Sequence, residues 1–498
     1  MLLIYPPLAK ACEPPGGLPI LGGALKAHNT KYKIVDFNLE GTNYLLNCYF
    51  NKFPKKEHYR NQLTSSLGYK NIDTYKKCIN ELNKGLNYLS NKETTLTLAN
   101  YESSKYDITS SKELIRIAAN YKDNIFYDFY SLRLIELVNE LNPGYIGISL
   151  QFLNQAESTF ALIGFIKNTF PNIKIVVGGG LITSWAKSPY WENPFVDIID
   201  KIIVGQGEVE LLKYLNVNID SSEIENIIPD YDFTLNYKYF SNGRIIPISG
   251  SLGCSWKKCS FCPENAENNP FITKKTLNII NEMKILKEKY NPVLFHFLDN
   301  EISPSLLKKI IESKNIVPWY GFTKFYDLLL DPLFCLQLKE AGCFMLKLGL
   351  ESGNQDVLNF MNKGIDLKNV SIILNNLKKA DIKTFIYILF GTPYENYSSA
   401  KDTLNYVLEH NELITYLNVA LFNLPLGSEL AKEYSTYDYT PTDLSLYSGF
   451  IHPNGWNRKE VRTFINEEIK TKPEIKKILN RTLPIYNANH AFFLKDQL

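Results

Sequence analysis

The chain has 498 residues, of which 45% are hydrophobic and 21% charged. This composition indicates a globular protein of two or three domains and excludes a disordered, collagenous or coiled-coil chain. The formal net charge of +2 provides no general attraction to nucleic acid or anionic membranes, and no apolar run approaches the roughly 18 residues of a membrane span. The first residues, MLLIYPP, lack a basic flank, so we expect no signal peptide.

Residues 1–215 alternate short apolar strands with helical patterns, which predicts an α/β, doubly wound, Rossmann-like domain. Residues 42–140 interrupt the alternation with helical stretches, at 76–90 and 112–141, and we interpret them as a helical insertion. The strands are expected at 2–5, 33–37, 145–149, 174–177 and 201–204, and the helices at 18–28, 157–170 and 208–214.

Two glycine clusters directly follow predicted strands of this domain. They are Gly178-Gly179-Gly180 and Gly205-Gln206-Gly207. Glycines at these places let a ligand approach the backbone at the carboxyl edge of a sheet. The clusters alone do not identify the ligand, and a nucleotide would suit them equally.

A linker is expected at 216–243, followed by a second alternating series over 244–430. Six strand–helix units predict a partial (β/α)6 barrel of the TIM type, open at one side. Residues 431–498 have a weak pattern and are expected to form a C-terminal tail or subdomain. The strands are expected at 245–249, 293–298, 318–323, 344–350, 384–390 and 416–421, and the helices at 273–289, 305–313, 332–341, 367–380 and 398–410.

Three of the eight cysteines, Cys254, Cys259 and Cys262, form a Cys-x4-Cys-x2-Cys motif after the first barrel strand. Three thiolates this close in sequence repel one another unless a cation holds them. A [4Fe–4S] cluster bound by three cysteines keeps one iron open for chemistry. A structural zinc site would need a fourth ligand that the motif lacks, and unliganded thiols are the remaining alternative. The five scattered cysteines are expected to be small core residues.

The segment Gly253-Cys254-Ser-Trp-Lys-Lys-Cys259-Ser-Phe-Cys262-Pro263 resembles cobalamin-binding radical S-adenosylmethionine (SAM) proteins, the class B methylases. The resemblance extends over about 430 of the 498 residues. It implies that the three cysteines hold a [4Fe–4S] cluster and that SAM chelates the open iron. The commonest spacing in the family is Cys-x3-Cys-x2-Cys, so Lys257 or Lys258 is an additional residue here.

The resemblance also implies SAM-binding positions at the ends of successive barrel strands. Taken singly, Glu351 and Glu395 could instead cap helices, and Lys324 could be a solvated charge. The implied SAM-binding residues are Phe261, Asp299, Asn300, Lys324, Glu351, Ser352, Gly391, Thr392 and Glu395.

Cobalamin enters only through the resemblance, and it is expected at the carboxyl edge of the first domain. The segment Asp36–Gly41 contains no histidine, which implies a cobalt ion without a protein histidine beneath it. The implied cobalamin-binding residues are Ser149, Gln151, Gly178, Gly179, Gly180, Gly205, Gln206 and Gly207.

The implied activity is methylation of an unactivated carbon with the cluster, SAM and methylcobalamin. Alternatives are a cobalamin-dependent cyclisation, rearrangement or oxidation without methyl transfer, a non-catalytic cobalamin or redox sensor, and a zinc-stapled nucleotide-binding module. We expect a small-molecule or peptide substrate, an external flavodoxin-like or ferredoxin-like electron donor, no nucleic acid partner, and a cytoplasmic location. No acid–base residue is assigned, because the positions of His296, His452 and Asp327 indicate no role.

Overall fold

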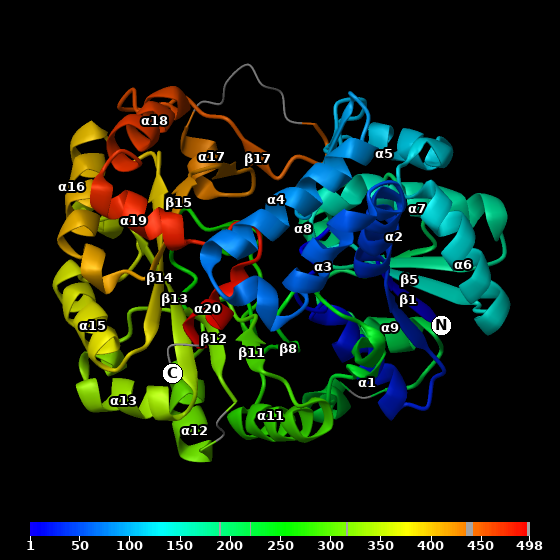
Figure 1. Ribbon diagram of the computed structural model, residues 1–498, viewed down its shortest axis with the longest axis horizontal. Helices are drawn as coiled ribbons and strands as arrows, with labels where there is room; N and C mark the ends of the chain where they lie inside the picture. The colour runs from blue at the N-terminus through cyan, green and yellow to red at the C-terminus, as the bar shows by residue number, and fades with distance from the viewer. Residues whose placement is uncertain (189–190, 220, 315–316, 435–441, 496–498) are drawn as a thin grey trace. The chain divides into compact units, whose positions relative to one another are not determined.

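The computed structural model describes residues 1–498 except 189–190, 220, 315–316, 435–441 and 496–498. The chain forms two compact units, each built on a parallel sheet (Figure 1). Unit 1 comprises Met1–Ile245, Thr442–Ser445 and Pro484–Leu498, and unit 2 comprises Ile246–Pro441 and Leu446–Leu483.

The sheet of unit 1 is parallel and has the strand order β2-β1-β5-β6-β7. This order confirms the predicted doubly wound fold, and it reverses between β1 and β5, where such sheets bind ligands at their carboxyl ends. The strands are β1 (Leu2–Tyr5), β2 (Lys33–Asp36), β5 (Tyr145–Ser149), β6 (Lys174–Gly178) and β7 (Lys201–Ile202).

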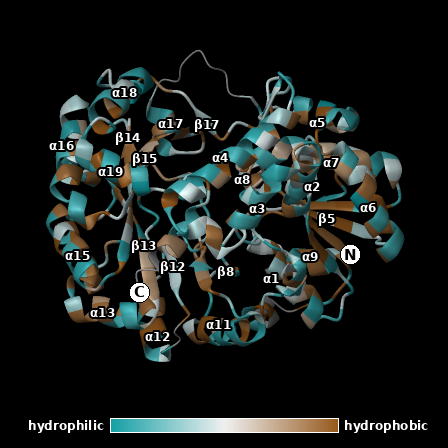
Figure 2. Cartoon of the chain, in the orientation of Figure 1, coloured by the Kyte–Doolittle hydropathy of each residue, from teal (hydrophilic) through white to brown (hydrophobic). Residues whose placement is uncertain are grey.

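Alternation of side chains along these strands builds the core of unit 1. Leu3, Ile34 and Val176 pack with buried leucines of α1 (Gly17–Ala27) and α9 (Glu208–Tyr214). Helix α7 (Ala156–Thr169) is buried on all sides over most of its length, since α5 (Ser111–Ala119) and α6 (Tyr127–Leu141) pack against it. Figure 2 shows the hydrophobic strands around β5 and the more polar surface of α4 (Ile72–Leu89).

The helical insertion contains α3 (Glu57–Leu63), α4, α5 and α6, together with most of α2 (Phe37–Lys52). Two details differ from the sequence pattern. The helix expected over 112–141 is two helices, because the backbone N–H of Asn120 closes α5 by donating to Arg116 and Ile117. A short hairpin of β3 (Thr94–Leu96) and β4 (Tyr101–Ser103) was not predicted.

Residues 216–243, expected as a linker, lie within compact unit 1. Ile227 and Phe233 pack against its core, and the backbone N–H of Asp230 donates to the carbonyl oxygen of Pro19 at 2.8 Å. The expected tail is also divided, because Pro484–Leu498 belong to unit 1 and Leu446–Leu483 to unit 2.

Unit 2 contains, within the described residues, a sheet of six parallel strands in the order β15-β14-β13-β12-β11-β8. Each strand in this order lies beside the strand of the next strand–helix unit along the chain, which confirms the predicted partial barrel. The side chains of Ser303, Asp331, Asp366 and Asn396 cap the helices that follow the strands. The strands are β8 (Ile245–Ile248), β11 (Leu294–Phe297), β12 (Trp319–Thr323), β13 (Cys343–Glu351), β14 (Lys383–Phe390) and β15 (Tyr416–Leu421). The helices between them are α11 (Thr276–Tyr290), α12 (Pro304–Ser313), α13 (Pro332–Glu340), α15 (Leu367–Lys379) and α16 (Tyr397–Glu409).

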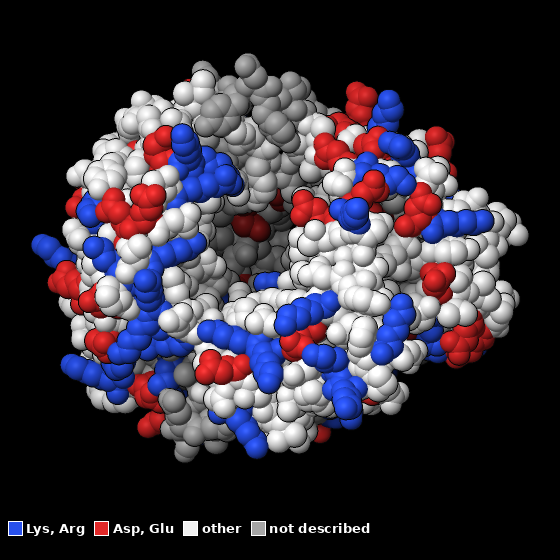
Figure 3. Space-filling model, turned by 45° about the horizontal axis from the view of Figure 1, so that its top comes forward, with Lys and Arg blue, Asp and Glu red and all other residues white. Residues whose placement is uncertain are grey.

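Shorter elements complete the two units. In unit 1 they are α8 (Gly180–Ala186) and α20 (Phe492–Lys495). In unit 2 they are β9 (Ser251–Leu252), α10 (Pro263–Ala266), β10 (Ile272–Thr273), α14 (Gln355–Phe360), β16 (Leu424–Pro425), α17 (Glu429–Glu433), β17 (Tyr447–Ser448), α18 (Arg458–Phe464) and α19 (Pro473–Arg481). Among the described residues, no helix combines the length and apolar character needed to span a bilayer. Lys and Arg lie among Asp and Glu on the face drawn in Figure 3.

Candidate active site at the cysteine loop

The three motif cysteines lie in the loop between β9 and α10, after the first strand of the barrel. All three are free and partly exposed. Gly253 begins the loop with φ +75°, and a Cβ there would lie 2.4 Å from the carbonyl oxygen of Pro270, so only glycine fits. At the other end, Cys262 precedes α10 and its N–H donates to the carbonyl oxygen of Cys259 at 3.3 Å.

The thiols share one electrostatic environment. Burial raises the pKa of the Cys259 thiol to about 11, against the opposing effect of the Lys363 charge. Burial also raises the pKa of the Cys262 thiol, and a charge on Cys254 raises it further. Among the described residues, no three His, Cys, Asp or Glu side chains converge as ligands of a single metal ion.

A structural zinc site takes four protein ligands around one ion, and the loop supplies three cysteines. In a cubane each cysteine ligates a different iron, so the three sulfurs stand farther apart than the ligands of one ion. The hydroxyl of Ser260, between two of the cysteines, is buried without a partner among the described residues. The donor set therefore fits an iron–sulfur cluster.

Trp256 fixes the stretch between the first two cysteines. Its Nε1–H donates to the carbonyl oxygen of Asn362 at 2.7 Å, and its ring lies against Gly364. The Lys324 ammonium stands 3.6 Å from the centroid of the same ring. Lys257 has φ +47°, so the additional residue of the motif is accommodated by a left-handed turn directly after the anchored tryptophan.

Glu301 holds the start of the loop, and the sequence pattern missed it. Its side chain is buried, with 1% exposure, and Oε1 accepts from the N–H of Ser255 at 2.7 Å and from the Ser255 hydroxyl. Oε2 accepts from the hydroxyl of Tyr326 at 2.8 Å. Ser255 directly follows Cys254, so Glu301 positions the first cysteine. Its place in the run Asp299-Asn300-Glu301 is the one signal that could have found it.

Replacing Glu301 with alanine is expected to destabilise the protein by about 2 kcal/mol, because three donors around a buried carboxylate lose their acceptor. Glu312→Ala on α12 is the matched control, since Glu312 is 62% exposed and pairs with Lys309 on the surface. It should cost less than about 0.5 kcal/mol. Denaturant unfolding measures both variants, and equal losses would contradict the assigned position of Glu301.

Asp299 and Asn300 differ from Glu301 in their contacts. The carboxylate of Asp299 is buried and accepts from the N–H of Gly250 at 2.9 Å and from the Ser251 hydroxyl at 2.6 Å. It thus fixes the chain after β8. Asn300 is exposed. Their implied contact with SAM stays a prediction.

Glu351 is joined to a residue that sequence reasoning missed. Lys363 donates to Glu351 Oε1 at 2.7 Å, and both side chains are 13% exposed. The Lys363 ammonium also lies 5.7 Å from the ring centroid of Phe261. Lys363 thus links Glu351, at the carboxyl end of β13, to Phe261 in the cysteine loop. Ser352 is buried and bonds to Thr403 instead.

The turn after β14 is closed by Glu395. Its Oε2 accepts from the N–H of Gly391 at 2.6 Å and from Nε1–H of Trp456 at 2.8 Å. His452 Nε2–H donates to the carbonyl oxygen of Thr392 at 2.7 Å. The Thr392 hydroxyl is buried without a partner among the described residues, so this turn retains a free hydroxyl for a ligand.

Glu395 should also make stability depend on pH. Burial raises the pKa of its carboxyl from 4.5 to about 7 despite the two donors. The folded state therefore binds more protons than the unfolded state between these values, and stability falls by roughly 3 kcal/mol as pH rises from about 4.5 to 7. Burial also raises the pKa of Asp36 to about 7, so part of the decline should persist in Glu395→Gln. Glu395→Gln should make the decline smaller in denaturant unfolding measured from pH 5 to 8. Glu429→Gln, at a side chain 81% exposed, should leave it unchanged, and an unchanged decline in Glu395→Gln would contradict the assignment.

The structure also brings together most of the residues that are predicted to bind cobalamin, at the carboxyl edge of the sheet of unit 1. Gln151 donates through Nε2 to the Ser149 hydroxyl at 2.9 Å and accepts from the N–H of Gly180 at 2.9 Å. Gly179 has φ +114°, and a Cβ there would lie 2.4 Å from the carbonyl oxygen of Leu150. The N–H of Gly205 donates to Thr183 of α8 at 3.0 Å. Gln206 is exposed, and Gly207 precedes α9.

Residues 248–407 match the family model of the radical SAM superfamily. The chain contains a radical SAM domain. The matched residues extend from the end of β8 into α16 and include the cysteine loop, in agreement with the resemblance found in the sequence.

Similarity to individual proteins extends beyond this domain. A bacteriochlorophyllide d C-12(1)-methyltransferase of Chlorobaculum tepidum is 28% identical over 191 residues, which are 36% of this chain and 41% of the relative, so the match spans less than half of that protein. The solved structure of the radical SAM methyltransferase TsrM of Kitasatospora setae, with cobalamin and a [4Fe–4S] cluster bound, is 15% identical. Its TM-score is 0.52, covering 87% of this chain and 77% of TsrM. The cobalamin-dependent radical SAM enzyme OxsB with aqua-cobalamin bound is 13% identical with a TM-score of 0.58, covering 93% of this chain and 66% of OxsB. Both structures share the α/β fold.

Proposed function

We propose that the protein is a cobalamin-dependent radical SAM enzyme that transfers a methyl group to an unactivated carbon. The observation that carries the proposal is the cysteine loop, which presents three free thiols at fixed points after the first strand of a radical SAM domain. The structural similarity to TsrM and OxsB, which extends over most of the chain, supports a cobalamin-binding part in addition.

Cys254, Cys259 and Cys262 would hold the cluster, and the free hydroxyl of Thr392 and the Lys363–Glu351 pair would face SAM. Ser149, Gln151 and the two glycine clusters would hold cobalamin. When bound, the cluster supplies the electron that cleaves SAM, and cobalamin carries the methyl group.

The protein's own contribution is positioning. Glu301 and Trp256 fix the two halves of the loop that would bind the cluster, and Glu395 fixes the turn beside the SAM position. Rigid placement of reacting groups lowers the entropic part of a barrier.

We further propose a small-molecule or peptide substrate, a flavodoxin-like or ferredoxin-like electron donor, and work in the cytoplasm. The last follows from chemistry, because a cluster with an open iron is sensitive to oxygen.

The test is anaerobic reconstitution with iron, sulfide and cobalamin, followed by incubation with a strong reductant and methyl-labelled SAM. We expect two products that need no knowledge of the substrate: 5′-deoxyadenosine and labelled methylcobalamin. Labelled methylcobalamin should be absent when cobalamin is left out. Formation of 5′-deoxyadenosine without label on cobalamin would favour cyclisation or oxidation. Absence of both products would favour a non-catalytic sensor.

A further inference from the structure

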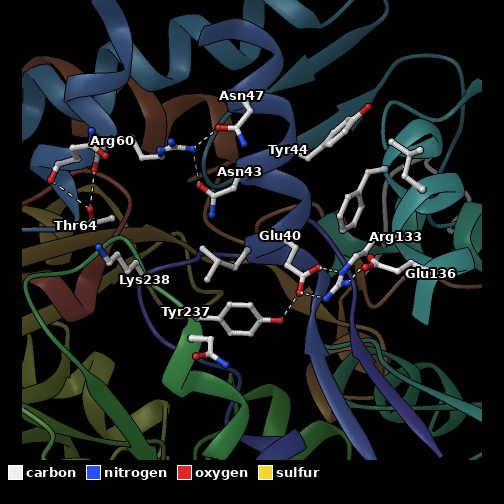
Figure 4. A pocket seen from close by; sticks show the side chains of 15 residues that line it. Glu40, Asn43, Tyr44, Asn47, Arg60, Thr64, Arg133, Glu136, Tyr237 and Lys238 are labelled. Atoms are coloured by element: carbon white, nitrogen blue, oxygen red, sulfur yellow. Dashed lines mark hydrogen bonds and ion pairs between the residues drawn. The ribbon is translucent and has the colours of Figure 1, made fainter. Parts of the chain in front are cut away.

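A cavity of about 810 Å³ lies in unit 1, away from the residues assigned above. Helices α2, α3 and α6 and the segment 236–238 form its walls (Figure 4). The volume is within the range of small-molecule sites, which is roughly 300–1,000 Å³. Its two ends differ in charge, and this difference indicates what it binds.

One end has paired charges. The guanidinium of Arg133 donates to both oxygens of Glu40, at 2.8 and 3.4 Å, and to Glu136 at 2.6 Å. The hydroxyl of Tyr237 donates to Glu40 at 2.5 Å. Figure 4 shows these four side chains as one connected group. Because two carboxylates face one cation here, this end does not attract an anion.

The opposite end presents donors. Arg60 donates to the amide oxygens of Asn47, at 2.6 Å, and Asn43, at 3.5 Å, and to Glu57 at 2.5 Å. An arginine can only donate, so the asparagine oxygens must face it and their NH₂ groups must face away. Figure 4 shows both NH₂ groups directed toward the middle of the cavity. Two of the five guanidinium donors remain for a ligand.

Lys238 adds a positive charge to the end of the cavity that contains Arg60. Its ammonium extends toward Thr64, at the same end as Arg60 (Figure 4). No carboxylate of the described residues forms an ion pair with it. Glu57 offsets Arg60, so Lys238 leaves one net positive charge among several N–H donors and a hydroxyl. Such a group of donors recognises a carboxylate or a phosphate by charge-assisted hydrogen bonds.

Apolar side chains line the wall between the two ends. Leu132 is 63% exposed and the Tyr44 ring is partly exposed, whereas Leu39 and Phe129 are 2% and 4% exposed and support the wall. The Phe129 ring is held by an edge contact with Phe37, with 4.9 Å between centroids. A flat apolar body would lie against this wall.

We propose that this cavity binds a small molecule with a carboxylate or phosphate group on a flat apolar body. The anionic group lies at Arg60 and Lys238, and the body lies along Leu132 and Tyr44. This site is independent of the proposed methyl transfer, since none of its lining residues belongs to the positions proposed for the cluster, SAM or cobalamin.

Calorimetric titration of the full chain with phenyl phosphate and with benzoate tests the proposal and distinguishes the two anionic groups. We expect one of them to bind, and Arg60→Gln and Lys238→Gln each to weaken its Kd about tenfold, as the loss of one charge-assisted hydrogen bond does. The matched controls are Arg116→Gln and Lys112→Gln on α5, which should leave the Kd unchanged. Arg116 is exposed and pairs with Glu113.

Three results would overturn the proposal. The first is that neither probe binds to the wild type. The second is that the Kd is unchanged in both Arg60→Gln and Lys238→Gln. The third is that inorganic phosphate binds as tightly as phenyl phosphate, which would show that the apolar part of the ligand adds no affinity. Arg60 is only 18% exposed, so Arg60→Gln can destabilise the fold as well as weaken binding. Lys238 is exposed, so the Kd of Lys238→Gln tests the site without this effect.

Discussion

Replacing Cys254, Cys259 or Cys262 singly with alanine is expected to abolish assembly of the cluster. A [4Fe–4S] cluster held by three thiolates cannot lose one and keep its place in the loop. Iron after anaerobic reconstitution should fall from about four per chain to near zero, and the electron paramagnetic resonance signal of the reduced cluster should disappear. Formation of 5′-deoxyadenosine should fall below detection with it.

Cys48→Ala is the matched control for this prediction. Cys48 is a free and partly exposed cysteine like the other three, but it lies on α2 of unit 1. Its variant should keep full iron content. Retention of iron by any of the three loop variants, or recovery of zinc in place of iron from the wild type, would remove the basis of the proposed function.

Gly364→Ala is expected to be strongly destabilising, although it adds only one methyl group beside Trp256. Gly364 has φ +68°, and an added Cβ would lie 2.2 Å from Cζ2 of Trp256. Displacing the ring would break the hydrogen bond of its Nε1–H to Asn362 and its contact with the Lys324 ammonium. We expect a loss of about 4 kcal/mol, from overpacking together with the left-handed backbone.

Gly455→Ala separates these two contributions. Gly455 has almost the same backbone angle, φ +67°, but its added Cβ would meet nothing within 4 Å. This variant should lose only the backbone cost of about 1–2 kcal/mol. Denaturant unfolding gives both values. Equal losses in the two variants would show that Trp256 is not held against Gly364.

The sequence predicts the strand–helix framework well because alternating apolar strands and capped helices are local patterns. Ser303, Asp331 and Asn396 each precede a helix of the barrel, and each can be recognised from its neighbours in the chain. The cysteine loop was also found locally, from the spacing of three residues.

The partners of the loop could not be found in this way. Lys363 meets Glu351 and Phe261, and Trp256 meets Asn362, from positions whose separation in sequence has no periodicity. These contacts depend on how β13 and the loops around it pack. The left-handed turn at Lys257 is equally hidden, since no glycine or asparagine marks it.

The last residues of the chain restrict how the protein can be divided. Asn489 is fully buried in unit 1, where its amide donates to the carbonyl oxygen of Phe240 at 2.8 Å and to the Tyr69 hydroxyl at 3.0 Å. A fragment cut after Ile245 would therefore leave that carbonyl with only the Tyr69 hydroxyl as a donor and would uncover the Phe240 ring, against which Tyr486 stacks. Expression of the first unit by itself needs residues 484–495 joined to it, for example by circular permutation.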